Sequence, residues 1–203
     1  DVTIAGIETI NITTSVDAST LNSLVVANAS TINISGNKAL TITTAVNMAD
    51  TTATAASAID GTIDASAMTG NLSIGAHTGD NAKITGGSGD DTFAMTSGLD
   101  KNDVLDGGAG ADTVSITAVA DDASLDLSTY QLTSVESFAV TGAAGGAEDP
   151  VDITIAADAA GVSTLVLNES QAHADGTDGT DEGTFTVTGL SSGDTVRLVN
   201  DKV

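Results

Sequence analysis

The sequence has no cysteine and no tryptophan, and only one proline, one tyrosine and three phenylalanines among 203 residues. The lack of cysteine excludes disulfide bonds and zinc–thiolate sites, but it does not separate a cytosolic from an extracellular protein. An aromatic content of 2% is too small to fill a broad globular core. Stacked Ile, Val and Leu side chains can fill a narrow solenoid, so the composition favours a slender fold.

Positive charge is also scarce. The chain has 5 Lys plus Arg against 28 Asp plus Glu, which gives a formal net charge of −23. Nucleic-acid binding is excluded as a function because neutralising phosphates needs Lys and Arg. So much negative charge destabilises a compact state unless cations screen it or bind to it. Bound divalent cations would meet that need directly.

Long hydrophobic runs are absent too, so we expect no membrane insertion, and no amino-terminal signal peptide is visible. An acidic chain can be disordered, but 40% of these residues are hydrophobic and they alternate with Thr and Ser. That alternation favours folded β structure. The sequence opens in the middle of a pattern at Asp1 and stops abruptly at Val203, so we expect a fragment of a longer protein.

Two segments fit the nonapeptide G-G-x-G-x-D-x-U-x, where U is a large apolar residue. They are residues 86–94, GGSGDDTFA, and residues 107–115, GGAGADTVS. Between them, residues 98–106 form a degenerate copy of the repeat that keeps the first glycine, Asp103 and Leu105. The pattern is typical of calcium-binding parallel β-helices. Two full matches and a degraded third in compatible phase indicate more than ordinary glycine-rich surface turns.

The spacing of the nonapeptide predicts half a coil, with a six-residue turn followed by a short strand. The glycines allow positive φ, so that backbone carbonyls can converge on a cation, and the aspartate at the sixth place adds negative charge. The eighth residue, Phe93, Leu105 or Val114, should point inward. Turns on one edge of the roll lie two half-coils apart, so the two full repeats should be stacked neighbours.

This register predicts which carboxylates share a calcium ion. Asp91 and Asp112 should share one on the first edge. On the opposite edge, Asp103 should pair either with Asp80 before it or with Asp121 and Asp122 after it. The candidate metal-binding residues are Gly86, Ser88, Gly89, Asp91, Gly107, Ala109, Gly110, Asp112, Asp103, Asp80 and Asp121.

Short β-type runs separated by Asn, Gly, Ser and Asp fill most of the remaining sequence. We therefore expect an all-β fold, a parallel β-solenoid with a calcium-binding β-roll. Residues 1–76 should form solenoid coils, residues 77–124 the calcium-binding turns, and residues 125–203 further coils with an acidic loop at 170–183, all in one continuous solenoid. Residues 135–140, VESFAV, also echo residues 7–12, IETINI.

The chain resembles the RTX proteins, and among them the calcium-dependent surface-layer (S-layer) proteins of Gram-negative bacteria. GGSGDDTF and GGAGADTV carry the specific part, and GIETINIT, SVESFAVTG, TIDASAMTG and STINISGN the less specific part. The resemblance implies type I secretion, folding outside the cell in calcium, and a parallel β-solenoid that tiles into a lattice on the cell surface. Its partners would be copies of itself and, through a segment outside this sequence, a cell-surface polysaccharide. Few nonapeptides are present, and the carboxy-terminal secretion signal of the family is not recognisable.

We expect no enzymatic activity. His77 and His173 are isolated rather than set in H-E-x-x-H, no G-x-S-x-G segment occurs, and Arg197 is the single arginine. The acidic loop could bind further calcium through Asp175, Asp178, Asp181 and Glu182, but charge runs are usually solvated. A flat Thr-x-Thr ice-binding face is a third and weaker interpretation.

Two function classes therefore stay open. The first is a structural S-layer subunit, which predicts ordered sheets or tubes when calcium is added. The second is a calcium-rigidified module of a large RTX adhesin or of another type I-secreted exoprotein, which predicts monomers without a lattice. The echoed segments at residues 7–12 and 135–140 favour the first class.

Overall fold

The computed structural model describes residues 1–27, 31–47, 61–77, 81–95, 99–119, 123–142, 153–157, 161–169 and 184–200. Three parts of the sequence with predicted features lie outside these residues: Asp80, the pair Asp121 and Asp122, and the acidic loop 170–183 with His173. The first glycine of the degenerate repeat, Gly98, also lies outside them.

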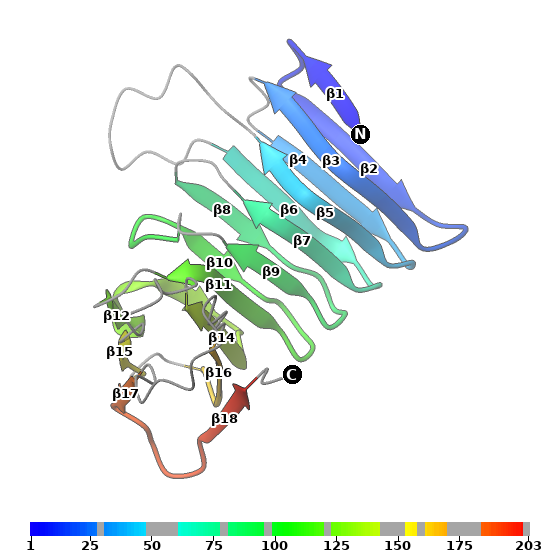
Figure 1. Cartoon of the computed structure of the whole chain (residues 1–203). Coiled ribbons are helices and arrows are strands. Elements are labelled where there is room, and N and C mark those ends of the chain that lie inside the picture. The colour runs from blue at the N-terminus through cyan, green and yellow to red at the C-terminus, as the bar shows by residue number, and fades with distance from the viewer. Residues whose placement is uncertain are drawn as a thin grey trace.

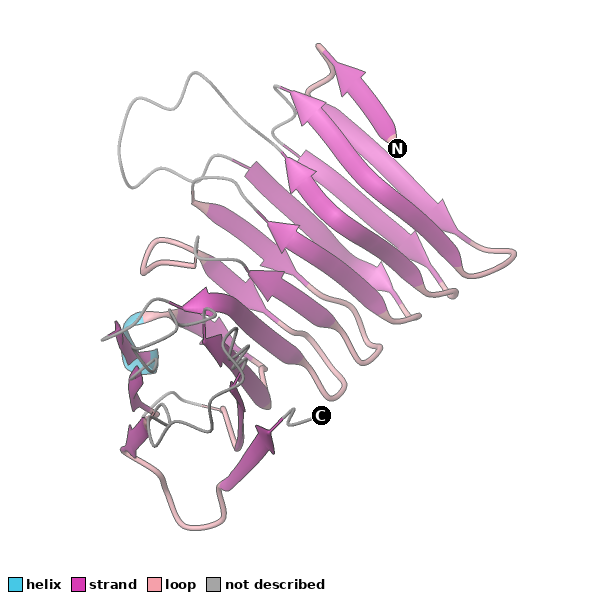
Figure 2. Cartoon of the chain, viewed as in Figure 1, coloured by secondary structure: helices cyan, strands magenta, loops and turns pink. Residues whose placement is uncertain are grey.

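The described residues form a parallel β-solenoid, as the sequence predicts. Figures 1 and 2 show long strands stacked in sheets that face each other. The single helix of the described part is a 3₁₀ turn at Leu127–Thr129, and it is far too short to cross a membrane. All of the strand pairs are parallel.

One sheet runs through the whole described chain, and the facing side is divided between two smaller sheets. The nine-stranded sheet contains β1 (Val2–Ala5), β3 (Ser19–Ala27), β5 (Leu40–Asn47), β7 (Leu72–His77), β9 (Thr92–Met95), β11 (Thr113–Val119), β14 (Ser137–Gly142), β16 (Thr164–Glu169) and β18 (Thr195–Asn200). The six-stranded sheet contains β13 (Gln131–Thr133), β10 (Val104–Asp106), β8 (Ala82–Thr85), β6 (Gly61–Met68), β4 (Thr31–Gly36) and β2 (Thr9–Thr14). The three-stranded sheet contains β12 (Ala123–Asp126), β15 (Ile153–Ala156) and β17 (Phe185–Thr188).

The core includes two long inward-facing columns, one on each main sheet, with further buried apolar residues beside them. In the six-stranded sheet the column runs Ile10, Ile32, Ile63, Ile84, Leu105, Leu132. In the nine-stranded sheet it runs Leu21, Ile42, Ile74, Phe93, Val114, Phe138, Leu165, Val196. The predicted inward residues of the repeats, Phe93, Leu105 and Val114, are all fully buried. A chain poor in aromatics fills this core because each coil has only a narrow space to fill.

The two echoed segments occupy different places in the coil. Residues 9–12 belong to β2 in the six-stranded sheet, whereas residues 137–140 belong to β14 in the nine-stranded sheet. Both place an apolar residue inward two positions after a glutamate, with Ile10 after Glu8 and Phe138 after Glu136. The echo therefore reflects a shared way of starting a strand and not a shared position in the solenoid.

Outward-facing hydroxyl groups form one continuous rank across the nine-stranded sheet: Thr20, Thr41, Ser73, Thr92, Thr113, Ser137, Thr164 and Thr195. The rank two residues further along the later strands carries Ala94, Ser115, Ala139, Val166 and Arg197 instead. From β9 to β18 this sheet therefore lacks the second hydroxyl rank that a Thr-x-Thr surface requires.

Candidate calcium-binding edge

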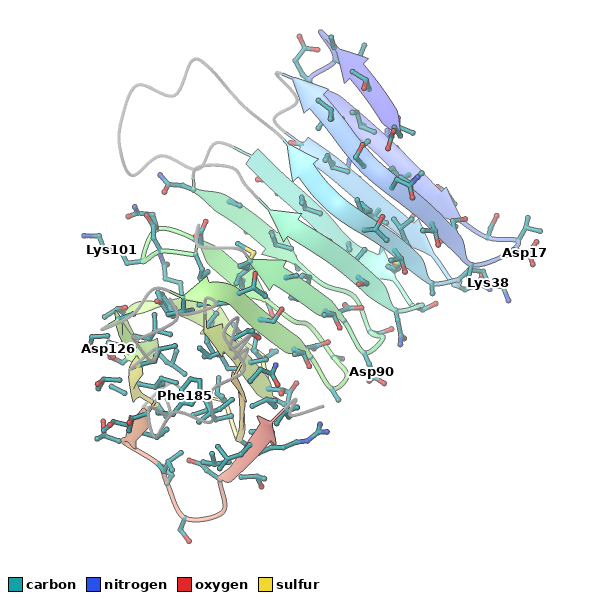
Figure 3. The ribbon with its side chains drawn as sticks, viewed as in Figure 1. Asp17, Lys38, Asp90, Lys101, Asp126 and Phe185 are labelled. Atoms are coloured by element: carbon teal, nitrogen blue, oxygen red, sulfur yellow. The ribbon has the colours of Figure 1, made fainter. Side chains whose placement is uncertain are left out.

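Two turns on one edge of the roll are longer than the turns that flank them. The turns 86–91, between β8 and β9, and 107–112, between β10 and β11, have six residues each. The flanking turns 69–71 and 134–136 have three residues each. We call these four turns together the repeat edge. Figure 3 labels Asp90 on this edge and Lys101 on the opposite one.

The two full repeats are stacked neighbours, which confirms the predicted register. Thr92 pairs with Thr113, and Phe93 pairs with Val114. The stacking continues through the turns, where the Ala109 N–H donates to the Gly87 carbonyl at 2.9 Å. The separation of 21 residues between the repeats therefore corresponds to one full coil.

Glycine is required at the first place of each repeat because of close packing. A Cβ at Gly86 would lie 2.2 Å from the Gly107 carbonyl oxygen and 2.5 Å from Asp91 Oδ2. A Cβ at Gly107 would lie 2.0 Å from the Ser134 carbonyl oxygen and 2.5 Å from Asp112 Oδ2. At both places a carbonyl of the next coil and a carboxylate of the same turn approach the glycine Cα.

The sequence argument assigned the wrong reason to most of these glycines. Of the candidate residues, only Gly110 has a φ in the left-handed region, at 137°. Gly86, Gly89 and Gly107 have no such φ. The stacked backbone of the neighbouring coil leaves no room for a side chain at these three positions, so the turn needs glycine there for its size.

Acidic side chains bind backbone N–H groups of the preceding coil along the inner side of the repeat edge. Asp91 Oδ1 accepts from the Leu72 N–H at 2.7 Å. Asp112 Oδ1 accepts from the Asp91 N–H at 2.7 Å, and Glu136 Oε2 accepts from the Asp112 N–H at 2.8 Å. We call Asp91, Asp112 and Glu136 the inner ladder. Each of these side chains stands one residue before a strand and makes a hydrogen bond to the preceding coil. Within the strands, backbone groups make the hydrogen bonds between coils.

A second set of contacts runs in the opposite sense on the solvent side. Asn71 Oδ1 accepts from the Asp90 N–H at 3.2 Å, and Asp90 Oδ1 accepts from the Ala111 N–H at 2.9 Å. Here each side chain accepts from the following coil. We call Asn71 and Asp90 the outer ladder. The two ladders together bind each long turn to both of its neighbours.

Burial and like charge act together on the inner ladder. Burial is the main cause that raises the pKa of Asp91 above its ordinary value of 3.8, against the effect of its backbone hydrogen bonds to Leu72 and Gly87. Burial likewise raises the pKa of Asp112, and the negative charges of Asp91, Glu136 and Asp90 add to the shift. A cation at this edge would lower the free energy of both ionised groups.

Asp91 and Asp112 differ in their second oxygen. Asp91 Oδ2 accepts from the Gly87 N–H of its own turn at 2.7 Å. The equivalent donor in the next turn, the Gly108 N–H, donates to Asp106 Oδ1 at 3.2 Å instead. Asp112 Oδ2 is therefore a fully buried acceptor without a hydrogen-bond donor among the described residues.

Asp103 lies on the opposite edge, as predicted, and it repeats the pattern of Asp91. Its Oδ1 accepts from the Ala82 N–H of the preceding coil at 2.7 Å, and its Oδ2 accepts from the Asp100 N–H of its own turn at 2.8 Å. Asp103 is 2% exposed. The predicted calcium partners Asp80 and Asp121 lie outside the described residues, so the pairing stays a prediction.

The donor set of the repeat edge suits a hard divalent cation. Oxygen atoms from carboxylates and backbone carbonyls are the ligands that calcium takes, usually six to eight of them at about 2.3–2.6 Å. The described residues contain no group of three or more His, Cys, Asp or Glu that could hold a metal ion by themselves. Carbonyl oxygens would therefore have to supply much of the coordination, as they do in glycine-rich turns.

Sequence reasoning missed Glu136, Ser134 and the outer ladder. Glu136 belongs to a three-residue turn that does not match the nonapeptide. One signal was available: Glu136 stands two residues before the inward Phe138, just as Asp91 stands before Phe93 and Asp112 before Val114.

Comparison of the chain with protein-family models, with curated proteins and with solved structures finds no match.

Proposed function

We propose that this chain is a structural, calcium-dependent S-layer subunit that folds and assembles outside the cell, on the surface of a Gram-negative bacterium. The observation that carries the proposal is the stacked pair of six-residue turns with buried carboxylates at Asp91 and Asp112. Burying ionised carboxylates is costly unless they are paired or bind a metal. Calcium at this edge would offset that cost and would fix the turns to each other.

The residues that would hold calcium are those of the repeat edge. Asp91 and Asp112 would contribute carboxylate oxygens, and the turns 86–91 and 107–112 would contribute carbonyl oxygens. Each carboxylate oxygen has a second lone pair beyond the one that accepts a backbone N–H. The calcium ion would supply charge compensation and cross-linking, because a structural role requires no chemical step.

Assembly is supported by the charge and by the ends of the roll. A few calcium ions in the turns would leave most of the net charge of −23 uncompensated. Copies in contact would repel each other unless divalent ions bridge them. The last coil also leaves apolar side chains uncovered, with Leu198 73% exposed and Val196 38% exposed. Unpaired strands at an open end are sites where another strand can add.

The test is a calcium titration of the full-length protein, with assembly followed by light scattering and electron microscopy, and with magnesium as the control. We expect folding at low calcium and ordered sheets or tubes at higher calcium, with no assembly in magnesium. If the folded protein stays monomeric at tens of millimolar calcium, the lattice proposal fails and the adhesin-module alternative takes its place.

A further inference from the structure

The unmatched oxygen of the repeat edge lies beside Gly107, where the following coil also approaches. Asp112 is fully buried, and its Oδ2 has no hydrogen-bond donor among the described residues. The nearest backbone of the following coil belongs to the short turn 134–136, because a Cβ at Gly107 would contact both the Ser134 carbonyl oxygen, at 2.0 Å, and Asp112 Oδ2, at 2.5 Å. The two acceptor oxygens are therefore at most 4.5 Å apart, the sum of these two distances, and a positive charge between them would stabilise both.

The conformation of the turn 134–136 places the Ser134 carbonyl at this position. Ser134 has a φ of 50° and is the one non-glycine residue of the described part with positive φ. Its place in the coil is the place of Gly107 one coil earlier, since Thr133 pairs with Asp106. The turn then reaches Phe138 in three fewer residues than a nonapeptide would, and the longer side chain of Glu136 spans the distance to the Asp112 N–H.

Glu136 brings a second carboxylate to the same place. Its Oε2 is bound to the Asp112 N–H at 2.8 Å, and the side chain is half-buried, so the solvent can reach this end of the edge. Its negative charge is close enough to act on the Asp112 carboxyl. Two carboxylates and a carbonyl oxygen thus meet beside the last full repeat.

We propose that the repeat edge binds a further calcium ion between the second nonapeptide and the non-repeat turn 134–136, through Asp112 Oδ2, the Ser134 carbonyl oxygen and the Glu136 carboxylate. This site is distinct from the one expected between the two repeats, and it rests on the proposed function only for the identity of the ion. It explains why the inner ladder continues for one coil after the glycine-rich repeats end. The ion would join the repeat pair to the carboxy-terminal coils.

A proton is the competing occupant. A protonated Asp112 would donate its Oδ2–H to the Ser134 carbonyl and would satisfy both oxygens without any metal. The two occupants differ in their dependence on Glu136, because the carboxylate charge of Glu136 favours a cation but is not needed for a neutral carboxylic acid. Neutralising Glu136 while keeping its hydrogen bond therefore separates them.

The experiment compares calcium binding to the unchanged chain, to Glu136→Gln and to Glu8→Gln by isothermal titration calorimetry at neutral pH. The glutamine oxygen can still accept the Asp112 N–H, so the fold should persist, which circular dichroism checks. Glu8→Gln is the matched control, with the same change of charge in the echoed segment next to β2. We expect Glu136→Gln to weaken one ion by about tenfold or more, since ligand charge sets calcium affinity, and Glu8→Gln to bind as the unchanged chain does.

Unchanged binding of every ion in Glu136→Gln would overturn this site and leave the calcium site between the repeats standing. If the unchanged chain binds no calcium, the proposed function fails and this site fails with it. If Glu136→Gln does not fold, hydrogen exchange of the unchanged chain tests the site instead. Calcium must then slow exchange of the amides in residues 134–138, and an exchange rate there that calcium does not alter would reject the site.

Discussion

Asp91 and Asp112 stand at equivalent places in two stacked coils, yet their side chains are not equally satisfied. Asp91 accepts a backbone N–H at each oxygen, at 2.7 Å in both cases. Asp112 accepts one N–H and leaves Oδ2 buried without a donor. An unsatisfied buried acceptor costs about 1–3 kcal/mol. The same substitution at the two positions should therefore have opposite effects on the calcium-free protein.

We predict that Asp112→Asn raises, and Asp91→Asn lowers, the melting temperature measured in chelator. At position 112 the amide NH₂ would replace Oδ2 and could donate to the Ser134 carbonyl, whereas at position 91 it would face the Gly87 N–H. For a chain of this length each 1 kcal/mol corresponds to about 2–4 °C. Calorimetry of the two variants gives the answer. Shifts of opposite sign support the assignment of the donors, and a loss of stability in both variants contradicts it.

The raised pKa values of Asp91 and Asp112 predict a pH dependence with a definite sign. A carboxyl whose pKa is higher in the folded than in the unfolded state binds protons more readily when folded. Its stabilising effect is complete below the unfolded value, near 3.8, and is lost as the pH rises through the raised folded value. In chelator, the contribution of this pair to the unfolding free energy should therefore increase as the pH falls through that window.

Calcium should reverse this dependence, because protons and the metal compete for the same oxygens. Urea unfolding across this pH range measures the pH dependence of the unfolding free energy, once with calcium and once with chelator. Asp64 contributes a pH dependence of the unfolding free energy with the opposite sign, because hydrogen bonds from Ser66 lower its pKa. The difference between the unchanged chain and Asp112→Asn removes this background. A difference that does not change with pH would show that Asp112 titrates normally.

Among the elements, we expect the long turns to be the part of the roll that depends most on metal. Each repeat loses the backbone entropy of nine residues on folding but buries only one large apolar side chain. Hydrogen bonds between coils offset part of that entropy, and we expect bound calcium to offset more of it. The three-residue turns at 37–39 and 69–71 order fewer residues for the same inward columns.

We predict that chelation exposes the long turns before the amino-terminal coils. Hydrogen exchange followed by mass spectrometry should show faster exchange of residues 86–112 in chelator than in calcium. Residues 31–47, whose strands are joined by a three-residue turn, serve as the internal control and should exchange at the same rate in both conditions. Uniform acceleration along the chain would instead indicate that the whole solenoid folds as one unit around the metal.

At the same scale, the sequence predicts the stacked repeats well and the turns around them poorly. The repeat spacing determines the coil, so the pairing of Thr92 with Thr113 and the inward direction of Phe93 follow from it. Glu136 and Ser134 do not follow, because their turn reaches the same register with fewer residues and a longer side chain. The sequence also does not predict the change from the six-stranded to the three-stranded sheet near β12 and β13. Strands of both sheets alternate apolar and polar residues, so the alternation does not distinguish them.

On the scale of the whole molecule, large apolar side chains are exposed on β18, the last described strand. Leu198 pairs with Leu167 in the preceding coil and occupies the same inward column, but Leu198 is 73% exposed and Leu167 is 2% exposed. The exposed end adds apolar surface to a molecule whose remaining surface is strongly acidic. Such a patch is typical of an interface or of a place where chains associate.

We predict that Leu198→Lys reduces calcium-independent self-association and leaves the fold intact. Exposed substitutions usually change the unfolding free energy by no more than about 0.5 kcal/mol. Leu167→Lys is the matched control, because it places the same charge in the same column where the side chain is buried, and it should unfold the carboxy-terminal coils. Light scattering and thermal melting report the two effects. Similar melting temperatures for the two variants would contradict the burial described for this column.

The two ladders of the repeat edge also have a mechanical consequence. Stretched from its ends, a parallel roll should come apart one coil at a time, and the coil between the two repeats should release the 21 residues that separate Asp91 from Asp112. At about 3.3–3.6 Å per extended residue, that is a step of about 7 nm. The long turns are bound to both neighbours through oppositely directed contacts, so the force should rise when the unravelling front reaches them. Optical tweezers would record that point as a calcium-dependent pause. The repeat edge would then resist unravelling more strongly than the coils on either side of it.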